Sequence, residues 1–374
     1  MTDIETLRNE LSELDLKIIE LVHRRQVLSE EIGAIKRDKG RPTRDYQREK
    51  LVIELAKSHA EKLNVDPLMV VDLMQLLIQS SLKTQESARV KEEGQGNGKK
   101  VLIIGGLGRM GSWFSEFMSM QGYDVHIADK NIDEEDESHF SNWKDTDDNY
   151  DITVVATPLR ESKEILEEIL EHGREGILFD IASIKSPIKE TLTKISEKGM
   201  RVTSIHPMFG PDTDLLTGKH IVFMNLDEQD SHLEIMKLFE STTAQLIEMS
   251  IDSHDYAISY VLGLSHIINI AFSKVLHDSG EKEEEFSQVS STTFKDQIEV
   301  ARRVSQENPN LYFEIQHLND HSIKTIEELN RVIQEISDAI TMGSEENFVK
   351  IMNSGKKHFE DVEAYTMSFV LLVI

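Results

Sequence analysis

The sequence predicts a multidomain chain in which an all-helical domain precedes a doubly wound α/β domain and a second all-helical domain. Apolar residues recur at helical spacing over the first 90 residues, short apolar runs alternate with helical patterns in the middle, and the strand pattern stops after Asp252. The 374 residues suit two or three domains of ordinary size. We expect a first domain at 1–90, a linker at 91–98, the α/β domain at 99–250 and the last domain at 251–374.

The residues from Ile4 to Arg37 predict one helix of about 50 Å, at 1.5 Å per residue. Its apolar positions are Ile4, Leu7, Leu11, Leu14, Ile18, Leu21, Leu28, Ile32 and Ile35. A second helical pattern runs from Asp45 to Leu63, and Asp66-Pro67 opens a third that continues to Leu82. One long helix beside two shorter ones cannot bury its stripe within a single chain, so we expect partner helices from a second subunit.

The segment from Lys91 to Gly98 has three glycines among polar residues, which is typical of a linker. Short apolar runs, typical of buried parallel strands, then follow at 101–104, 125–128, 152–156, 177–180, 202–205 and 221–224. Helical patterns separate most of these runs. This alternation predicts a doubly wound sheet.

Gly106-Leu107-Gly108-Arg109-Met110-Gly111 follows the first strand and opens a helix expected from Ser112 to Gly122. Glycines at this spacing allow a tight turn, close approach of the backbone to a pyrophosphate, and helix-to-strand packing. Asp129 ends the next strand, where a carboxylate accepts hydrogen bonds from ribose and repels a 2′-phosphate. We therefore expect a Rossmann-type domain that prefers NAD, although Lys130 weakens that preference. The alternative is a glycine-rich turn with a surface aspartate.

Composition excludes several classes of protein. The chain has 41 basic and 68 acidic side chains, a net charge of −27, and no cysteine. Without cysteine there is no disulfide scaffold, thiol catalyst or cysteine zinc site, and we expect no metal site. The negative charge disfavours nucleic acid and anionic membranes. With no signal peptide or membrane span in the pattern, we expect a cytoplasmic protein, with the apolar end at 367–374 completing a buried helix.

The charge is unevenly distributed along the chain. Residues 1–90 hold 15 basic and 16 acidic residues, a net of −1, which leaves 26 basic and 52 acidic residues, a net of −26, for residues 91–374. The first domain therefore has a different surface from the rest. Its polar residues on the predicted helices include Arg8, Arg25, Lys36, Asp45, Arg48, Glu49, Ser81 and Gln85. Ordinary surface salt bridges explain any one of these arginines, but not the set.

With these residues the chain resembles the family of bifunctional chorismate mutase–prephenate dehydrogenases, the T-proteins, over nearly all of its length. The resemblance runs from Leu7-Arg8 through the polar set of the first domain and across the linker into the turn at 105–111. Its most specific stretch is His206-Pro207-Met208-Phe209-Gly210-Pro211-Asp212. The resemblance implies an all-helical mutase shared between intertwined subunits of a homodimer, a Rossmann-type domain, and a helical domain for substrate binding and dimerisation.

For the mutase, the resemblance implies that Arg8 of the neighbouring subunit and Arg25 hold the two carboxylates of chorismate. Arg48 would orient the substrate, with Asp45, Glu49 and Ser81 at its hydroxyl side and with Lys36 and Gln85 at the ether oxygen. A Claisen rearrangement needs no nucleophile, only a dianion held in a compact conformer and donors aimed at the oxygen that gains charge. Because an amide donates at any pH, we expect mutase activity to persist at neutral pH.

For the dehydrogenase, the resemblance implies that His206 takes the proton of the 4-hydroxyl of prephenate while hydride passes to NAD. Loss of carbon dioxide then gives 4-hydroxyphenylpyruvate. An imidazole needs little tuning of its pKa for this role. The further implied contacts are Ser183 between the histidine, the hydroxyl and the nicotinamide, Thr157-Pro158 at the nicotinamide pocket, Asp212 as an ion-pair gate, and His266 and Arg303 from the helical domain, with Arg303 on a carboxylate.

Some alternatives stay open. Arg302 competes with Arg303, since the two lie about 100° apart on a helix and one alone can face the substrate. His266 is otherwise a satisfied core histidine. The dehydrogenase could prefer arogenate, or one half of the chain could have become an inactive sensor of NAD or an aromatic metabolite. With no separate regulatory domain in the pattern, we expect any inhibition by L-tyrosine to act at or near the prephenate site.

Overall fold

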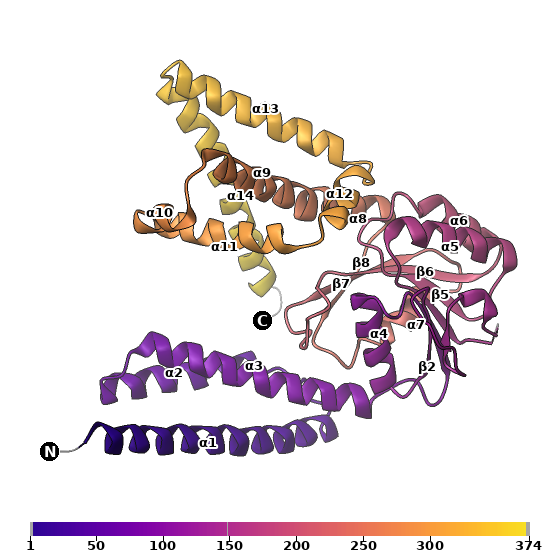
Figure 1. Ribbon diagram of the computed structural model, residues 1–374, viewed down its shortest axis with the longest axis horizontal. Coiled ribbons are helices and arrows are strands. Elements are labelled where there is room, and N and C mark those ends of the chain that lie inside the picture. Colours follow the sequence, from indigo (N-terminus) through magenta and orange to yellow (C-terminus); the bar gives the residue numbers. More distant parts are fainter. Residues whose placement is uncertain (1–2, 148, 372–374) are drawn as a thin grey trace. The chain divides into compact units, whose positions relative to one another are not determined.

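The computed structural model describes residues 3–147 and 149–371, and the surroundings of side chains as far as residue 359. The chain forms two compact units, Met1–His254 and Asp255–Ile374 (Figure 1). The apolar end at 367–374, expected to complete a buried helix, lies outside the described side chains.

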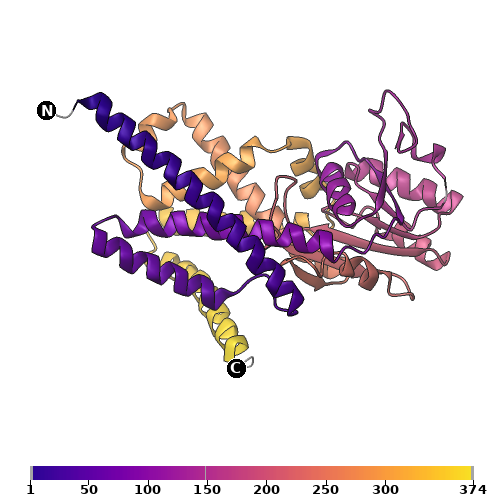
Figure 2. The ribbon, with the colours of Figure 1, turned by 90° about the horizontal axis from the view of Figure 1, so that it is seen from below.

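Three helices begin the first unit: α1 (Ile4–Asp38), α2 (Tyr46–Leu63) and α3 (Pro67–Glu92). The Asp45 carboxylate caps α2 by accepting the N–H of Arg48 at 3.0 Å, and Asp66 caps α3 in the same way. Helix α3 packs against both α1 and α2, and Figure 2 shows α1 crossing α3 at an angle. The three predicted helices are therefore confirmed, with α3 longer than its apolar pattern indicates.

The apolar stripe of α1 is not buried by the chain's own helices. Leu7, Leu11, Leu14, Ile18 and Leu21 are each between 52% and 65% exposed. Soluble proteins rarely leave a contiguous apolar surface of this length in water. The expectation that one chain cannot cover this helix is met.

The segment predicted as a linker is a fixed connection. Helix α3 continues to Glu92, and Val90, 3% exposed, belongs to the core of the α/β domain. A Cβ atom on Gly94 would lie 2.5 Å from the carbonyl oxygen of Gln121, and the backbone N–H of Gly96 donates to that same oxygen at 3.0 Å. The glycines therefore permit close backbone packing, a use of glycine that composition does not distinguish from flexibility.

The α/β domain is built on an eight-stranded sheet in the order β3-β2-β1-β4-β5-β6-β7-β8. Strands β1 to β6 run parallel to one another, whereas β7 and β8 are parallel to each other and antiparallel to the rest. The strands are β1 (Lys100–Ile104), β2 (Asp124–Ala128), β3 (His139–Phe140), β4 (Ile152–Val155), β5 (Ile177–Asp180), β6 (Arg201–Pro207), β7 (His220–Asn225) and β8 (Gln245–Glu248). All six predicted strands are present. The apolar pattern does not show β3 and β8, which are short and incompletely buried.

Helices cover both faces of this sheet. Helix α4 (Arg109–Met120) and α7 (Ser231–Lys237) pack with the core on one face, whereas α5 (Leu159–His172) and α6 (Lys189–Glu197) bury their apolar sides on the other (Figure 1). A single 3₁₀ turn, Trp143–Asp145, follows β3. Helix α4 begins at Arg109, three residues earlier than predicted, so its first turn lies within the glycine motif.

The second unit is helical throughout its described part. Its elements are α8 (Ile251–Ile258, which begins in the first unit), a π-helix at Ser259–Leu264, α9 (Ser265–Ser279), α10 (Glu283–Gln288), α11 (Thr292–Gln306), α12 (Pro309–His317), α13 (Ser322–Thr341) and α14 (Glu345–Leu371). No membrane span was expected from the sequence. The continuous helical stretch Ile251–Ser279 is nevertheless long and apolar enough to cross a membrane, with a mean hydropathy of 1.3 over an 18-residue window. Length and composition alone support this, and core helices of soluble proteins share both properties.

Candidate active sites

A cavity of about 670 Å³ lies among α1, α2 and α3. We call it the helical cavity. Seven of the eight polar residues predicted for a site in this domain line it: Arg25, Lys36, Asp45, Arg48, Glu49, Ser81 and Gln85. The sequence therefore identified a real cluster, drawn from three helices.

The eighth residue, Arg8, lies elsewhere. It is exposed near the start of α1, where it pairs with Glu5 at 3.1 Å. Arg25 follows it by 17 positions, which is about 25 Å along a helix. Arg8 therefore cannot serve the helical cavity of its own chain, in line with the expectation that a neighbouring subunit provides it.

Two cations of the helical cavity, Arg25 and Lys36, are held by neutral oxygen atoms. The Arg25 guanidinium donates to the carbonyl of Leu77 at 2.5 Å and to the hydroxyl of Ser81, and the Lys36 amine donates to the carbonyl of Thr43 at 2.6 Å. Burial lowers the pKa of Arg25 from its ordinary value of 12.5. With neutral partners, both charges are positioned but not neutralised, which suits an anionic ligand.

Two of the predicted carboxylates are already engaged. Asp45 caps α2, and Glu49 accepts hydrogen bonds from Arg44 at 3.0 to 3.3 Å. The sequence pattern did not single out Arg44, because an arginine five residues before a glutamate is common on surfaces. Asp45 and Glu49 therefore line the cavity and also hold the local structure of its wall.

Gln85 is fixed by a residue that the sequence did not identify. Its Nε2 donates to the hydroxyl of Ser29 at 2.7 Å, while its Oε1 is buried without a partner. A half-turn of the amide places Oε1 on the Ser29 hydroxyl and turns Nε2 toward the cavity, so that no buried acceptor lacks a donor. Gln85 then presents an N–H donor, as its predicted role requires.

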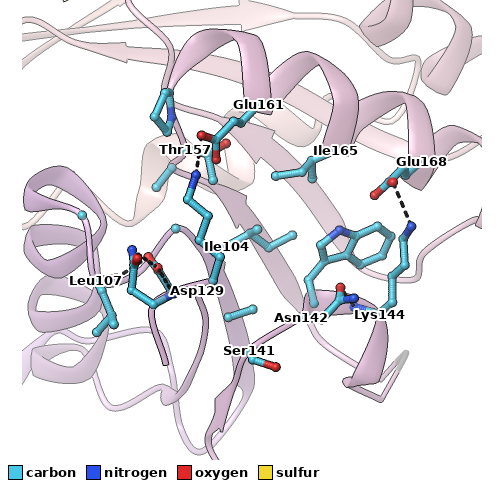
Figure 3. A pocket seen from close by; sticks show the side chains of 18 residues that line it. Ile104, Leu107, Asp129, Ser141, Asn142, Lys144, Thr157, Glu161, Ile165 and Glu168 are labelled. Atoms are coloured by element: carbon cyan, nitrogen blue, oxygen red, sulfur yellow. Dashed lines mark hydrogen bonds and ion pairs between the residues drawn. The ribbon is translucent and has the colours of Figure 1, made fainter. Parts of the chain in front are cut away.

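The predicted dinucleotide turn has the geometry that its glycines imply. Gly105 adopts a φ of +86°, and a Cβ atom on Gly106 would lie 2.5 Å from Cγ2 of Ile127. A cavity of about 530 Å³, the dinucleotide cavity, opens above this turn and is also lined by Asp129, Thr157 and Pro158 (Figure 3). Side chains would fill the space at the turn, so the bare backbone and the start of α4 fit a pyrophosphate.

Asp129 and Lys130 lie on one wall of the dinucleotide cavity. Asp129 accepts hydrogen bonds from the N–H of Leu107 at 3.1 Å and from Asn131 at 2.9 and 3.0 Å, which fixes its carboxylate. Lys130 pairs with Glu161 at 2.6 Å, and this partner raises the pKa of the lysine. Since Glu161 offsets its charge, Lys130 gives little attraction to a 2′-phosphate, and the cavity fits NAD. Trp143 and Asn142, unmarked in the sequence, line the same cavity.

The predicted ion pair of Asp212 is present. Its carboxylate lies 2.6 Å from the guanidinium of Arg109, the first residue of α4. Both side chains are exposed, so the pair is weak by itself. A gating role for it stays a prediction.

His206 lies near the end of β6 and is 4% exposed. Its Nδ1 lies 2.8 Å from Nε2 of His254, a buried residue that the sequence did not reveal because 48 positions separate the two. Burial lowers the pKa of His206 well below 6.5, and electrostatic interactions with His254 and Lys185 lower it further. The expectation of little tuning took no account of the cost of burying a charged imidazole, which lowers this pKa.

A buried ion pair lies behind this histidine. The Lys185 amine is fully buried and donates to Asp180 at 2.6 Å and to the carbonyl of Ile205 at 2.7 Å. Ser183 lies between the two charged residues in the sequence and is half-buried. An aspartate at the end of a buried strand, followed five residues later by a lysine, was the available signal for this pair.

The other predicted residues belong to the second unit. The ring of His266 stacks on Tyr312 with centroids 4.1 Å apart, and burial lowers its pKa. Arg302 pairs with Glu283, whereas Arg303 is exposed and forms no ion pair within the described part of the chain. The geometry therefore favours Arg303 over Arg302 as the cation open to a ligand.

Three family models match successive parts of the chain. Residues 7–86 match chorismate mutase type II, residues 118–248 match the nucleotide-binding domain of prephenate dehydrogenase, and residues 250–354 match its dimerization domain. The glycine turn lies before the second match, so its role rests on the geometry above.

Individual relatives agree with this division. A T-protein of Enterobacter agglomerans is 22% identical over 365 residues, which cover 96% of this chain and 94% of the relative. A chorismate mutase of Methanocaldococcus jannaschii is 30% identical over 94 residues, or 25% of this chain and 93% of the mutase. From the same organism, a protein named probable arogenate/prephenate dehydrogenase is 28% identical over 271 residues, or 69% of this chain, which spans only 60% of that relative.

The crystal structure of prephenate dehydrogenase from A. aeolicus, solved with hydroxyphenyl propionate and NAD+, shares the fold. Its TM-score is 0.57 at 20% identity, over 71% of this chain and 98% of that one. Taken with the order of the domains and the residues of the two cavities, these matches show that the chain belongs to the family in which a type II chorismate mutase is fused to a prephenate dehydrogenase.

Proposed function

We propose that the chain catalyses two consecutive reactions of tyrosine biosynthesis, from chorismate to prephenate and then, with NAD, from prephenate to 4-hydroxyphenylpyruvate. One observation carries this proposal. Seven polar side chains from three helices converge on one cavity, in a chain whose next domain holds a dinucleotide turn. The product of the first site is the substrate of the second.

At the helical cavity, Arg25 and the Arg8 of a second subunit bind the carboxylates of chorismate. Lys36 and the turned amide of Gln85 donate to the ether oxygen, whose negative charge grows as its bond breaks. No side chain needs to gain or lose a proton. The cavity accelerates the reaction by holding one conformer and by stabilising that charge.

At the dehydrogenase site, His206 is neutral at working pH because its pKa is lowered. If its Nδ1–H donates to His254, its Nε2 is the acceptor for the proton of the 4-hydroxyl of prephenate. NAD supplies the hydride acceptor. Ser183 contacts the hydroxyl, and Arg303 pairs with a substrate carboxylate through its planar fork. Loss of carbon dioxide from the oxidised ring gives the aromatic product.

The assembly we propose is a cytoplasmic homodimer. The exposed stripe of α1 and the match to a dimerization domain both support a second copy of the chain. Sedimentation of the purified protein should give twice the chain mass of 42.7 kDa. A stable monomer that retains mutase activity would refute the shared site.

Arogenate is the second candidate substrate, and the name of the relative from Methanocaldococcus jannaschii favours testing it. Comparing NADH formation with prephenate and with arogenate decides between them. We also propose that L-tyrosine inhibits at or near the prephenate site. Inhibition that is non-competitive with prephenate at all concentrations would contradict this.

One experiment tests both activities in the same preparation. Chorismate loss and NADH formation are followed in the wild type, Lys36→Ala and His206→Asn. We expect each variant to lose one activity and keep the other. Protein that consumes chorismate without producing NADH from either substrate would support the alternative of a sensor with an inactive half.

A further inference from the structure

Glu86 directly follows Gln85 on α3 and turns away from the helical cavity into the α/β domain. Its carboxylate is buried, with the residue 5% exposed. Oε1 accepts the backbone N–H of Leu216 at 2.7 Å, and Oε2 accepts the N–H of Thr243 at 2.8 Å and also its hydroxyl. A side chain of the mutase helix is thus held by three donors of the neighbouring domain.

This arrangement is specific in its geometry. Within the described residues no cation pairs with Glu86, so its carboxylate depends on these donors alone, and losing them would leave a charge buried without partners. By contrast, Lys83 and Asp214 form an exposed pair at 2.5 Å across the same boundary, which stabilises little. Both interactions join the same two domains. Of the two, only the contacts of Glu86 require α3 to keep one rotational and axial position.

The register of α3 determines where the mutase side chains lie. Successive residues of a helix are rotated by about 100°, so Gln85 faces the helical cavity while Glu86 faces the α/β domain. One turn earlier, Ser81 holds the guanidinium of Arg25. Any rotation or slide of α3 that releases Glu86 therefore moves both Gln85 and Ser81 relative to the cations on α1.

One donor of Glu86, the N–H of Leu216, belongs to a loop that also reaches the dinucleotide turn. Leu216 lies in the same loop as Asp212, the partner of Arg109, and the carbonyl of Thr213 in this loop accepts the indole N–H of Trp113 on α4 at 2.9 Å. The contact therefore connects the mutase helix to a part of the dehydrogenase that is itself fixed on α4.

We propose that Glu86 is a positioning residue for the mutase, through which the α/β domain holds Gln85 and Ser81 in place. The proposal rests on the mutase activity proposed above. If the wild type does not consume chorismate, that activity has failed, and Glu86 is not at issue.

The test uses full-length variants Glu86→Gln and Thr243→Val, with Lys83→Gln as the matched control. In Glu86→Gln, the side-chain NH2 group faces a backbone N–H, so two donors meet and one hydrogen bond is lost. In Thr243→Val, the hydroxyl that donates to Glu86 is lost from the α/β domain. We expect the mutase kcat to fall on the order of tenfold in Glu86→Gln and by less in Thr243→Val, since a misplacement of about 1 Å costs up to about 100-fold. The KM for chorismate should change little, because Arg25, Lys36 and Arg48 stay on α1 and α2.

NADH formation from prephenate at saturating NAD should be retained in both variants, and Lys83→Gln should match the wild type in both assays. A fall in mutase kcat in Thr243→Val, far from the helical cavity, is a result that general loss of stability in α3 would not produce. Unchanged mutase kcat in both variants overturns the proposal. So does equal loss in Lys83→Gln, or a parallel fall of both activities. If Glu86→Gln does not fold, Thr243→Val decides alone.

Discussion

Replacement of Gly111 by alanine tests how the glycine turn binds NAD. A Cβ atom at this position would lie 2.8 Å from the Cα of Gly106 and nearer still to the carbonyl oxygen of Gly105, whereas Cβ contacts below 3.0 Å essentially do not occur. To restore an ordinary separation near 3.5 Å, the first turn of α4 must move by about 0.7 Å or more. The backbone donors at the start of α4 then move away from the pyrophosphate.

The size of the effect follows from the donors that are displaced. A hydrogen bond to a charged group contributes about 1.5–3 kcal/mol, so weakening one of them should raise the Kd for NAD about ten- to 150-fold. Calorimetric titration of the full-length protein with NAD measures this directly. Gly355→Ala is the control, because a Cβ atom on that residue of α14 meets nothing within 4 Å. Chorismate turnover should persist in both variants, and an unchanged Kd in Gly111→Ala would refute the reasoning.

Three further predictions concern single side chains. Because burial lowers the pKa of His206 well below 6.5, kcat/KM for prephenate should stay level as the pH falls from neutrality to 6.5 and decline only in more acid solution; a pH–rate profile with its midpoint at or above 6.5 would contradict this. Ser29→Ala removes the hydroxyl that is hydrogen-bonded to Gln85, an interaction worth about 0.5–1.5 kcal/mol, so mutase kcat should fall about two- to tenfold while NADH formation is unchanged. Arg303→Lys should raise the KM for prephenate at least about tenfold, whereas Arg302→Lys should not, and equal effects would show that the pairing of Arg302 with Glu283 does not separate their roles.

Much of the fold follows from local patterns. The six predicted strands are short runs rich in apolar residues, and the glycine turn follows the first of them, so each was visible in a few neighbouring residues. Strand β3, with two residues, has too little pattern to detect. The fixed structure of the connection at 91–98 could not be predicted in this way. Its glycines pack against the backbone at 121–123, and no residue near them in the sequence indicates that contact.

The candidate sites divide in the same way. Residues that project from regular helices, such as Lys36 and Ser81, could be placed together from helical spacing and family resemblance. The contacts that tune them could not, because each depends on tertiary packing. His254 reaches His206 across 48 positions, and Glu86 reaches Thr243 across 157. Burial lowers the pKa of His206 and makes the Glu86 carboxylate depend on hydrogen-bond donors. Neither side chain is buried until the surrounding elements have packed.

Because the chain is strongly acidic, the pairing of each cation with a carboxylate affects how well that cation can attract an anionic substrate. Outside residues 1–90 the net charge is −26, which opposes the approach of a dianion such as prephenate. Around the dehydrogenase residues, Arg109, Lys130 and Lys185 each pair with a carboxylate, so none of them adds a full charge to attract the substrate. Arg303 differs in having no such partner within the described part of the chain, as do Arg25 and Lys36, whose hydrogen bonds go to neutral oxygens. A cation that the fold leaves uncompensated against so negative a background keeps its charge for a ligand, and Arg25, Lys36 and Arg303 meet this criterion.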